Sequence, residues 1–402
     1  MRRTWRLLTV ASVALCAAAC GTRAPGEARQ SPSPGAAGDH AASPTAGHAV
    51  ATTGSPLSGS FLMDLTWVSD QRGWALAAAP CDRGLCRRLA ATANGGRTWT
   101  ALPALPHCAR VACVSQVRFA TATVGYLFGP ALFQTSDGGR SWHRVPGRPV
   151  ESLEPSAGTV LRVGYDRTGC PGPCDYAVQE TNAGSATWRT VLHIPENTAM
   201  GSVGAQVVRQ GTTVSYLLLY GHMAGGAGTA HTMIFRSTDG GATWQRRPDP
   251  CGGRGRGEHD AIGLTAAPGG IAAALCAPRT GSGTTFVRTS TDNGSSWDPP
   301  RPVPAGTAHC LDMIAAASAA HLVLATGGTT GNGPFTSRLV ASGDDGRHWS
   351  AAVTGTAQLD PQAPGAAFLG FEDARVGRWI GGPHGIWTTH DAGRHWREQA
   401  FP

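Results

Sequence analysis

The sequence predicts an all-β protein, a seven-bladed β-propeller, from two observations. An eight-residue pattern recurs seven times: Ser or Thr, any residue, Asp or Asn, any residue, Gly, two further residues and Trp. Between the copies, short runs of alternating apolar residues are separated by turn residues, and no run keeps a helical period. A period of roughly 50 residues with strand-like content is typical of propeller blades, each a four-stranded sheet.

We call this pattern the box. Its Asp or Asn can accept backbone N–H groups just beyond it, its Gly adopts angles that are costly for other residues, and its Trp buries a large ring. Folding alone explains these requirements, so we expect a structural role and no catalysis. The residues so assigned are Asn94 and Trp99, Asp137 and Trp142, Asn182 and Trp188, Asp239 and Trp244, Asp292 and Trp297, Asp344 and Trp349, and Asp391 and Trp396. The third copy is degenerate, with one extra residue before Trp188.

The chain begins with a segment typical of export. Three arginines precede an apolar run that is too short to cross a bilayer comfortably, so we expect a cleaved signal over 1–19. The run ends in Ala-Ala-Ala-Cys20-Gly, which is similar to a bacterial lipobox and predicts a lipid on Cys20; cleavage by a different signal peptidase is the alternative. Residues 20–58 have hardly any large apolar side chains and predict a disordered tether. The propeller at 59–402 would then lie on the outer face of the cell membrane.

The composition limits the classes of partner. Only 15% of residues are charged, while 55 Gly and 28 Pro indicate many turns. All 33 basic residues are arginine, as is typical of a GC-rich coding genome such as those of actinobacteria. The net charge of +7 falls to about +4 without the three arginines of the signal segment, and no clustered basic stripe is visible. We therefore expect no nucleic acid partner.

The irregular segments predict one functional face. If each box joins the third and fourth strands of a blade, the first turns share its face and all other connections lie on the opposite face. The longest irregular segments, such as 222–231 and 327–333, fall in those other connections. We expect that face to recognise an unknown surface protein or glycan. Its predicted basic rim consists of Arg83, Arg110, Arg254, Arg256 and Arg279.

Cysteine spacing predicts disulfides in an exported protein. The expected pairs are Cys81 with Cys86, Cys108 with Cys113, Cys170 with Cys174, and Cys251 with Cys276, which leaves Cys310 over. Zinc binding is the alternative, but these spacings are not the usual ones for zinc sites.

The boxes resemble the Asp-box, or BNR, repeats of sialidases, sortilin-type receptors and photosystem II assembly factors of the HCF136/Ycf48 type. The resemblance covers roughly residues 60–402, and the segments 67–74, 119–126 and 371–379 are most similar to the assembly-factor version. It implies the propeller fold. Because such boxes occur in enzymes and in non-enzymes, it leaves the activity open.

A sialidase or another glycoside hydrolase is the enzymatic alternative. The resemblance to sialidases implies an arginine cluster, a Tyr with a Glu, and an acidic Asp, but the Phe/Tyr-Arg-Ile-Pro motif expected before the first box is missing. The tyrosines are Tyr126, Tyr165, Tyr176, Tyr216 and Tyr220. We identify no catalytic residue, cofactor site or metal site in the sequence. The predicted function is non-enzymatic recognition or assembly support for a protein or glycan.

Overall fold

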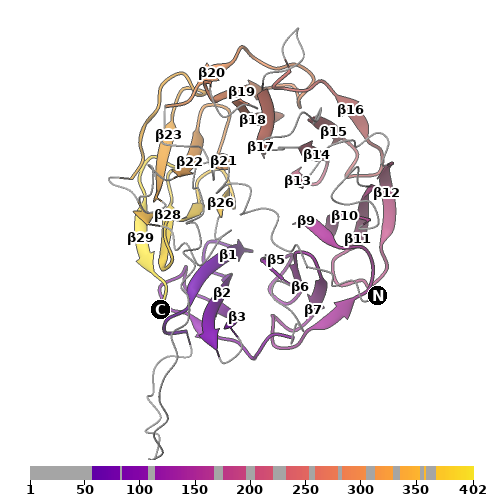
Figure 1. The fold of residues 1–402 in the computed structure, drawn as a ribbon, viewed down its shortest axis with the longest axis vertical. Coiled ribbons are helices and arrows are strands. Elements are labelled where there is room, and N and C mark those ends of the chain that lie inside the picture. Colours follow the sequence, from indigo (N-terminus) through magenta and orange to yellow (C-terminus); the bar gives the residue numbers. More distant parts are fainter. Residues whose placement is uncertain are drawn as a thin grey trace, which may run out of the picture.

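The computed structural model describes residues 57–81, 84–106, 114–166, 175–195, 204–220, 232–252, 259–278, 283–304, 313–328, 336–353, 357–358 and 368–402. The regular elements within these ranges are all β-strands, so the described part of the chain holds no helix able to span a bilayer. The strands form seven sheets arranged in a ring (Figure 1), which confirms the predicted seven-bladed β-propeller. The predicted signal segment and Cys20 lie outside the described residues.

The first four blades follow one another along the chain, each with four antiparallel strands. Blade 1 contains β1 (Phe61–Trp67), β2 (Gly73–Cys81), β3 (Gly84–Thr92) and β4 (Thr100–Ala101). Blade 2 contains β5 (Gln116–Phe119), β6 (Gly125–Phe128), β7 (Leu132–Thr135) and β8 (His143–Val145). Blade 3 contains β9 (Val150–Ser156), β10 (Thr159–Tyr165), β11 (Tyr176–Asn182) and β12 (Arg189–Ile194). Blade 4 contains β13 (Gly204–Gln210), β14 (Val214–Tyr220), β15 (Met233–Ser237) and β16 (Gln245–Arg247).

The last three blades repeat this plan, with one added strand. Blade 5 contains β17 (His259–Ala267), β18 (Ile271–Pro278), β19 (Phe286–Ser290) and β20 (Arg301–Pro302). Blade 6 contains β21 (Met313–Ala316), β22 (Leu322–Gly328), β23 (Thr336–Ser342) and β24 (Ser350–Ala351), and β25 (Ala357–Gln358) also pairs with β23. Blade 7 contains β26 (Leu369–Phe371), β27 (Gly377–Ile380), β28 (Gly385–Thr389) and β29 (Arg397–Ala400).

The boxes and the first turns of the blades share one face. Each box lies between the third and fourth strands of its blade, as expected. In all seven blades its turn donates a backbone N–H to a carbonyl oxygen in the first turn of the same blade, as from Gly95 to Gln71 and from Ala392 to Arg375, both at 2.9 Å. We call this side the box face. The opposite side, which holds the turns between second and third strands and the connections between blades, is the loop face.

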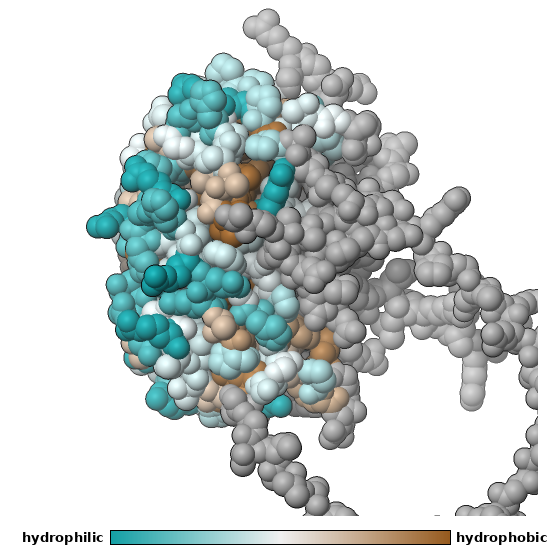
Figure 2. Space-filling model, turned by 90° about the vertical axis from the view of Figure 1, so that its left-hand side faces the viewer, coloured by the Kyte–Doolittle hydropathy of each residue, from teal (hydrophilic) through white to brown (hydrophobic). Residues whose placement is uncertain are grey.

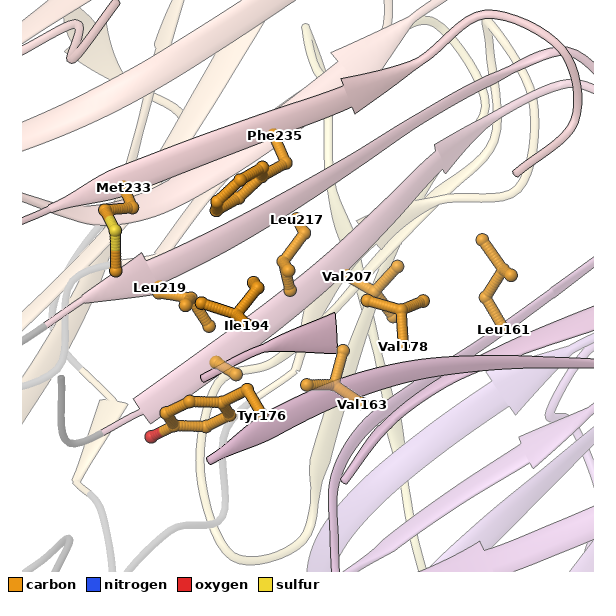
Figure 3. Close-up of a cluster of buried hydrophobic side chains, with 11 residues drawn as sticks. Leu161, Val163, Tyr176, Val178, Ile194, Val207, Leu217, Leu219, Met233 and Phe235 are labelled. Atoms are coloured by element: carbon orange, nitrogen blue, oxygen red, sulfur yellow. The ribbon is translucent and has the colours of Figure 1, made fainter. Parts of the chain in front are cut away.

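Seven hydrophobic clusters fill the seven seams between neighbouring blades. In the seam between blades 3 and 4 (Figure 3), Leu161 and Val178 pack with Leu217 and Phe235. The Trp of each box is half-buried and packs against the cluster that its blade shares with the preceding blade, as Trp244 does here. The box therefore stabilises a turn and a seam together, because burial of its indole requires the neighbouring blade.

The ring closes between blades 7 and 1 without an exchanged strand, since each sheet comes from one continuous stretch. Leu62 donates its N–H to the Pro383 carbonyl oxygen at 2.8 Å, and the rings of Trp99 and Phe401 lie edge to face at 5.5 Å. Leu57 is 1% exposed within the same seam cluster, so the packing of this seam includes a residue that precedes the predicted boundary at residue 59. Phe401 donates its N–H to the carbonyl oxygen of His384, in the loop-face turn after β27.

Candidate functional site

The polar side chains of the boxes are used by the turn itself. In the second box, Thr135 Oγ1 accepts the Gly139 N–H at 3.0 Å and donates to Asp137 Oδ1 at 2.7 Å. Asp137 Oδ1 also accepts the N–H groups of Arg140 and Ser141, both at 2.9 Å. These contacts, above all those from Ser141, hold the pKa of Asp137 well below its usual range. The carboxylate is thus committed to the turn, as we expected from the sequence.

The third box departs from this geometry. Thr181 Oγ1 donates to the Thr187 carbonyl oxygen at 2.7 Å, and Gly184 (φ +89°) follows Thr181 after two residues, whereas the other boxes have three at this point. Asn182 is exposed, and among the described residues its side chain makes none of the turn contacts of the other anchors. The assignment of Asn182 as a box anchor was therefore wrong, because the shortened turn moves its amide out of reach.

The predicted recognition residues of the loop face fall outside the described ranges. This holds for all five rim arginines, Arg83, Arg110, Arg254, Arg256 and Arg279, and for Cys108, Cys113, Cys170, Cys174 and Cys310. Two of the expected disulfides are present, one joining Cys81 to Cys86 and one joining Cys251 to Cys276. The first ties the tip of the β2–β3 hairpin on the loop face beside Leu85, whose 43% exposure makes it the one exposed large apolar side chain among the described residues.

A charged cluster lies on the loop face of blade 3. Asp175 receives both terminal nitrogens of Arg148 at 3.1 Å, and His193 Nε2 lies 2.6 Å from its other oxygen. The rings of Tyr165 and Tyr176 lie 6.4 Å apart nearby, at the paired ends of β10 and β11. The side chains of His193 and Arg148 are 54% and 35% exposed, so this cluster offers a partner an imidazole and a guanidinium group.

A polar network that the sequence did not reveal lies around the inner ring, where the first strand of each blade has an unpaired edge. Asp64 on β1 accepts the Val117 N–H and an Arg118 Nη1 hydrogen bond, both at 2.8 Å, and Arg118 Nε reaches Glu154 on β9 at 3.1 Å. Burial alone would lower the pKa of Arg118, but the two carboxylates raise it overall. Further along the ring, Ser152 Oγ accepts the Val207 N–H at 3.0 Å.

One signal for this network was present in the sequence. Asp64 is the one charged residue of the strand FLMDLTW and Arg118 is the one charged residue of QVRF, so opposite charges stand on two successive first strands. The contacts satisfy backbone groups that the neighbouring sheet cannot reach. The network therefore closes the inner edges of blades 1 to 4 and offers few free polar groups to a ligand.

Glu151 is the exception on the inner ring. It stands on β9, and burial raises its pKa to about 7. Among the described residues no hydrogen bond to its carboxyl group is found, whereas its carbonyl oxygen accepts Gln116 Nε2 at 3.2 Å. A carboxylate in this setting can act as an acid or base near neutral pH, but a glycosidase also needs a partner for it.

The tyrosines do not supply such a partner. Tyr126 and Tyr216 are fully buried in seams, Tyr176 is 2% exposed, and Tyr165 packs against the seam of blades 3 and 4. Nothing is described of the Tyr220 side chain. Within the described ranges no three His, Cys, Asp or Glu side chains come together as a metal ion would need.

The fold and its box turns define the chain as a seven-bladed β-propeller. No protein-family model matches the chain, and no curated protein matches it by sequence. Solved structures do match. An ancestral GH74 enzyme is 14% identical with a TM-score of 0.52, covering 86% of this chain and 47% of that one. The β-propeller domain of the Trilobed protease from Pyrococcus furiosus is 9% identical with a TM-score of 0.50, covering 84% and 97%.

A further similar structure is YCF48 bound to a D1 peptide, at 14% identity and a TM-score of 0.49, covering 83% of this chain and 94% of that one. At such identities these likenesses show the fold alone. Because a fold alone does not define an activity, the function of this chain has to be inferred from its own side chains.

Proposed function

We propose that this chain is an exported Asp-box lipoprotein, anchored through Cys20, whose propeller is a non-enzymatic recognition or assembly scaffold for a surface protein or glycan. The partner would bind the loop face. One observation carries the proposal: apart from Glu151 and Asn182, the polar groups described for the boxes and for the inner ring of blades 1 to 4 are hydrogen-bonded to the fold's own backbone or to one another. The four tyrosines whose side chains the structure describes pack in the seams between blades.

The loop face supplies what a binding surface needs. A disulfide ties the hairpin that presents Leu85, and the second disulfide ties Cys276 of β18 to Cys251 after β16. Cross-links of this kind reduce the ordering cost of binding. The cluster of Arg148, Asp175 and His193 adds charge to the same face.

Site-specific photo-crosslinking in the native host would test the recognition face. A photoreactive amino acid at Leu85 on the loop face is expected to give one discrete adduct, whereas the same group at Ala242 in a box turn gives none. Adducts from Ala242 alone, or none from a set of exposed loop-face positions, would contradict the proposal.

Labelling with radioactive palmitate tests the anchor: Cys20→Ser should abolish incorporation, and Cys16→Ser should leave it intact.

Hydrolysis of a fluorogenic sialoside tests the enzymatic alternative. Residues 56–402 contain every strand and all seven seams, so this soluble fragment can be assayed from about pH 4 to pH 8 with its disulfides intact. We expect no turnover above a heat-killed control. Turnover that is abolished in Glu151→Gln, or in Tyr165→Phe, would make the chain a glycosidase and overturn the proposal.

A further inference from the structure

The box face is asymmetric in its charge. In four neighbouring blades the residue two places before the box Trp is an exposed arginine. These are Arg347 in blade 6, Arg394 in blade 7, Arg97 in blade 1 and Arg140 in blade 2. Blades 3, 4 and 5 have Ala186, Ala242 and Ser295 at that position. Because seams join blade 6 to 7, 7 to 1 and 1 to 2, the four arginines form one continuous arc. We call it the arginine arc.

The guanidinium groups of the arc are available to a ligand. None of them forms an ion pair with a carboxylate within the described part of the chain. Arg140 Nη1 donates to the Asp137 carbonyl oxygen at 2.8 Å, Arg347 makes the same contact with Asp344 at 3.3 Å, and Arg394 Nη2 lies 2.8 Å from His321 Nε2. A guanidinium has five N–H donors, so most of these donors still face solvent.

The carboxylates beside the arc are already engaged. The box carboxylates of blades 2, 6 and 7 accept the hydrogen bonds of their turns, and blade 1 has the neutral Asn94 in their place. In blades 6 and 7 the turn also uses histidine: His348 Nδ1 lies 2.5 Å from Asp344 Oδ2, and His395 Nδ1 lies 2.6 Å from Asp391 Oδ2. Of two other exposed acids on this face, Asp373 accepts the N–H groups of Arg375 and Val376 at 2.7 and 2.8 Å, and Asp70 accepts a hydrogen bond from the Gln71 side chain at 3.4 Å.

We propose that the arginine arc binds one extended polyanion, a polymer that carries phosphate or carboxylate groups along its length. Arginine pairs with both groups through two parallel hydrogen bonds. Four cations spread over four successive blades suit a ligand that runs along the ring. This site is on the face opposite the proposed recognition surface and goes beyond that function.

An anionic membrane is the less suitable occupant. Proteins that lie on a bilayer bury exposed aromatic or aliphatic side chains in it. Among the described residues the one exposed large apolar side chain is Leu85, which lies on the loop face. Figure 2 looks onto the rim at blades 6 and 7, where hydrophilic residues cover most of the described surface and apolar patches lie between them.

Binding of fluorescently labelled inorganic polyphosphate to the 56–402 fragment tests the arc. We expect saturable binding at low salt, and none to neutral dextran. The double variant Arg347→Ser/Arg394→Ser should weaken binding at least tenfold, and Arg97→Ser/Arg140→Ser should do the same. A plot of log affinity against log salt concentration has a negative slope. Its magnitude should decrease by roughly 0.7 for each arginine that no longer pairs with a phosphate, the value for single-stranded nucleic acids.

The matched control removes the same charge elsewhere. Arg144→Ser/Arg246→Ser changes two exposed arginines on the outer strands of blades 2 and 4, neither of which forms an ion pair within the described part of the chain, and should alter the affinity less than threefold. Equal losses of affinity in the control and arc variants would mean that binding depends only on net charge, and would overturn the proposal. Unchanged binding in both arc variants would also overturn it. Binding to phosphatidylglycerol vesicles but not to polyphosphate would assign the arc to a membrane and also overturn it.

Discussion

At the scale of single residues, the box Asp acts as a hydrogen-bond acceptor that closes a turn. Asp239 accepts Thr243 N–H at 2.9 Å and the hydroxyl groups of Thr243 and Ser237 at 2.5 and 2.7 Å. Those contacts, led by the Thr243 hydroxyl, lower the pKa of Asp239 to about 2. Because the same role falls to Asn94 in blade 1, the turn requires an acceptor oxygen and does not require a charge.

Replacing this acceptor should destabilise the propeller modestly. Asp239→Ala is expected to lower the free energy of unfolding by about 1 kcal/mol at pH 7, and Asp239→Asn by less. The folded pKa lies below the unfolded value, so the advantage of the Asp is complete above about pH 4 and is lost as the pH falls through 2. Urea unfolding at pH 7 and pH 2 measures both effects. An equal loss of stability from Ala and Asn would contradict the acceptor role.

Glu151 should behave in the opposite sense. Burial raises its pKa to about 7, above the unfolded value near 4.3, so its contribution to stability is complete below about pH 4 and declines as the pH rises to 7. We expect Glu151→Gln to be neutral at pH 4 and to raise the midpoint of unfolding at pH 8. Thermal unfolding across this range measures the effect. A variant less stable than the wild type at pH 8 would show that the carboxylate has a stabilising partner.

At the scale of elements, the box glycine couples its turn to the neighbouring blade. Gly393 has φ +89°, and an added Cβ would lie 2.6 Å from Val323 Cγ2 of blade 6. Gly158 has a similar φ of +85°, but an added Cβ there would meet nothing within 4 Å. The two positions therefore separate backbone strain from crowding of the seam.

Alanine at these glycines should have unequal effects. Gly158→Ala is expected to cost about 1 kcal/mol from its backbone conformation alone. Gly393→Ala should cost about 2 to 4 kcal/mol, because crowding of a packed seam is added. Chemical unfolding of both variants measures the difference. Equal costs would mean that the seam yields to the methyl group, and the proposed coupling would be wrong.

The blades could be predicted from the sequence because each box lies within one hairpin and combines a turn residue, a glycine and a Trp at fixed local spacing. The inner-ring network could not, because Asp64 meets Arg118 only after the ring has formed. The degenerate third box shows the limit of a local pattern. Its letters allow Asn182 as the anchor, but the position of Gly184 in the turn decides otherwise.

At the scale of the whole molecule, the ring depends on the seam between blades 7 and 1. Arg378 is 1% exposed, lies 3.7 Å from the Trp67 ring centroid and donates to the Asp70 carbonyl oxygen at 2.9 Å. Its Nε also pairs with Glu372 Oε1 at 3.2 Å. Burial raises the pKa of Glu372 to about 7, although Arg378 acts to lower it. One buried cation therefore joins the first and last blades.

Removing Arg378 should weaken the ring as a unit. Arg378→Met leaves Glu372 without its partner and is expected to cost about 3 kcal/mol at pH 8, and less near pH 5, where Glu372 can be protonated. The destabilisation should appear as one earlier transition in calorimetry, because every blade shares seams with two others. A split transition, with blades 1 and 7 unfolding first, would contradict this cooperativity.

Because each blade is formed by one continuous stretch of chain, the coding sequence could be circularly permuted between blades. Leu57 and Phe401 belong to one seam cluster, and each blade is complete in a single stretch of chain. A circular permutant that joins the two ends and opens the ring between blades 4 and 5 would keep all seven sheets intact. We expect this permutant to fold into the same ring, because every blade keeps its two neighbours although synthesis starts at a different blade.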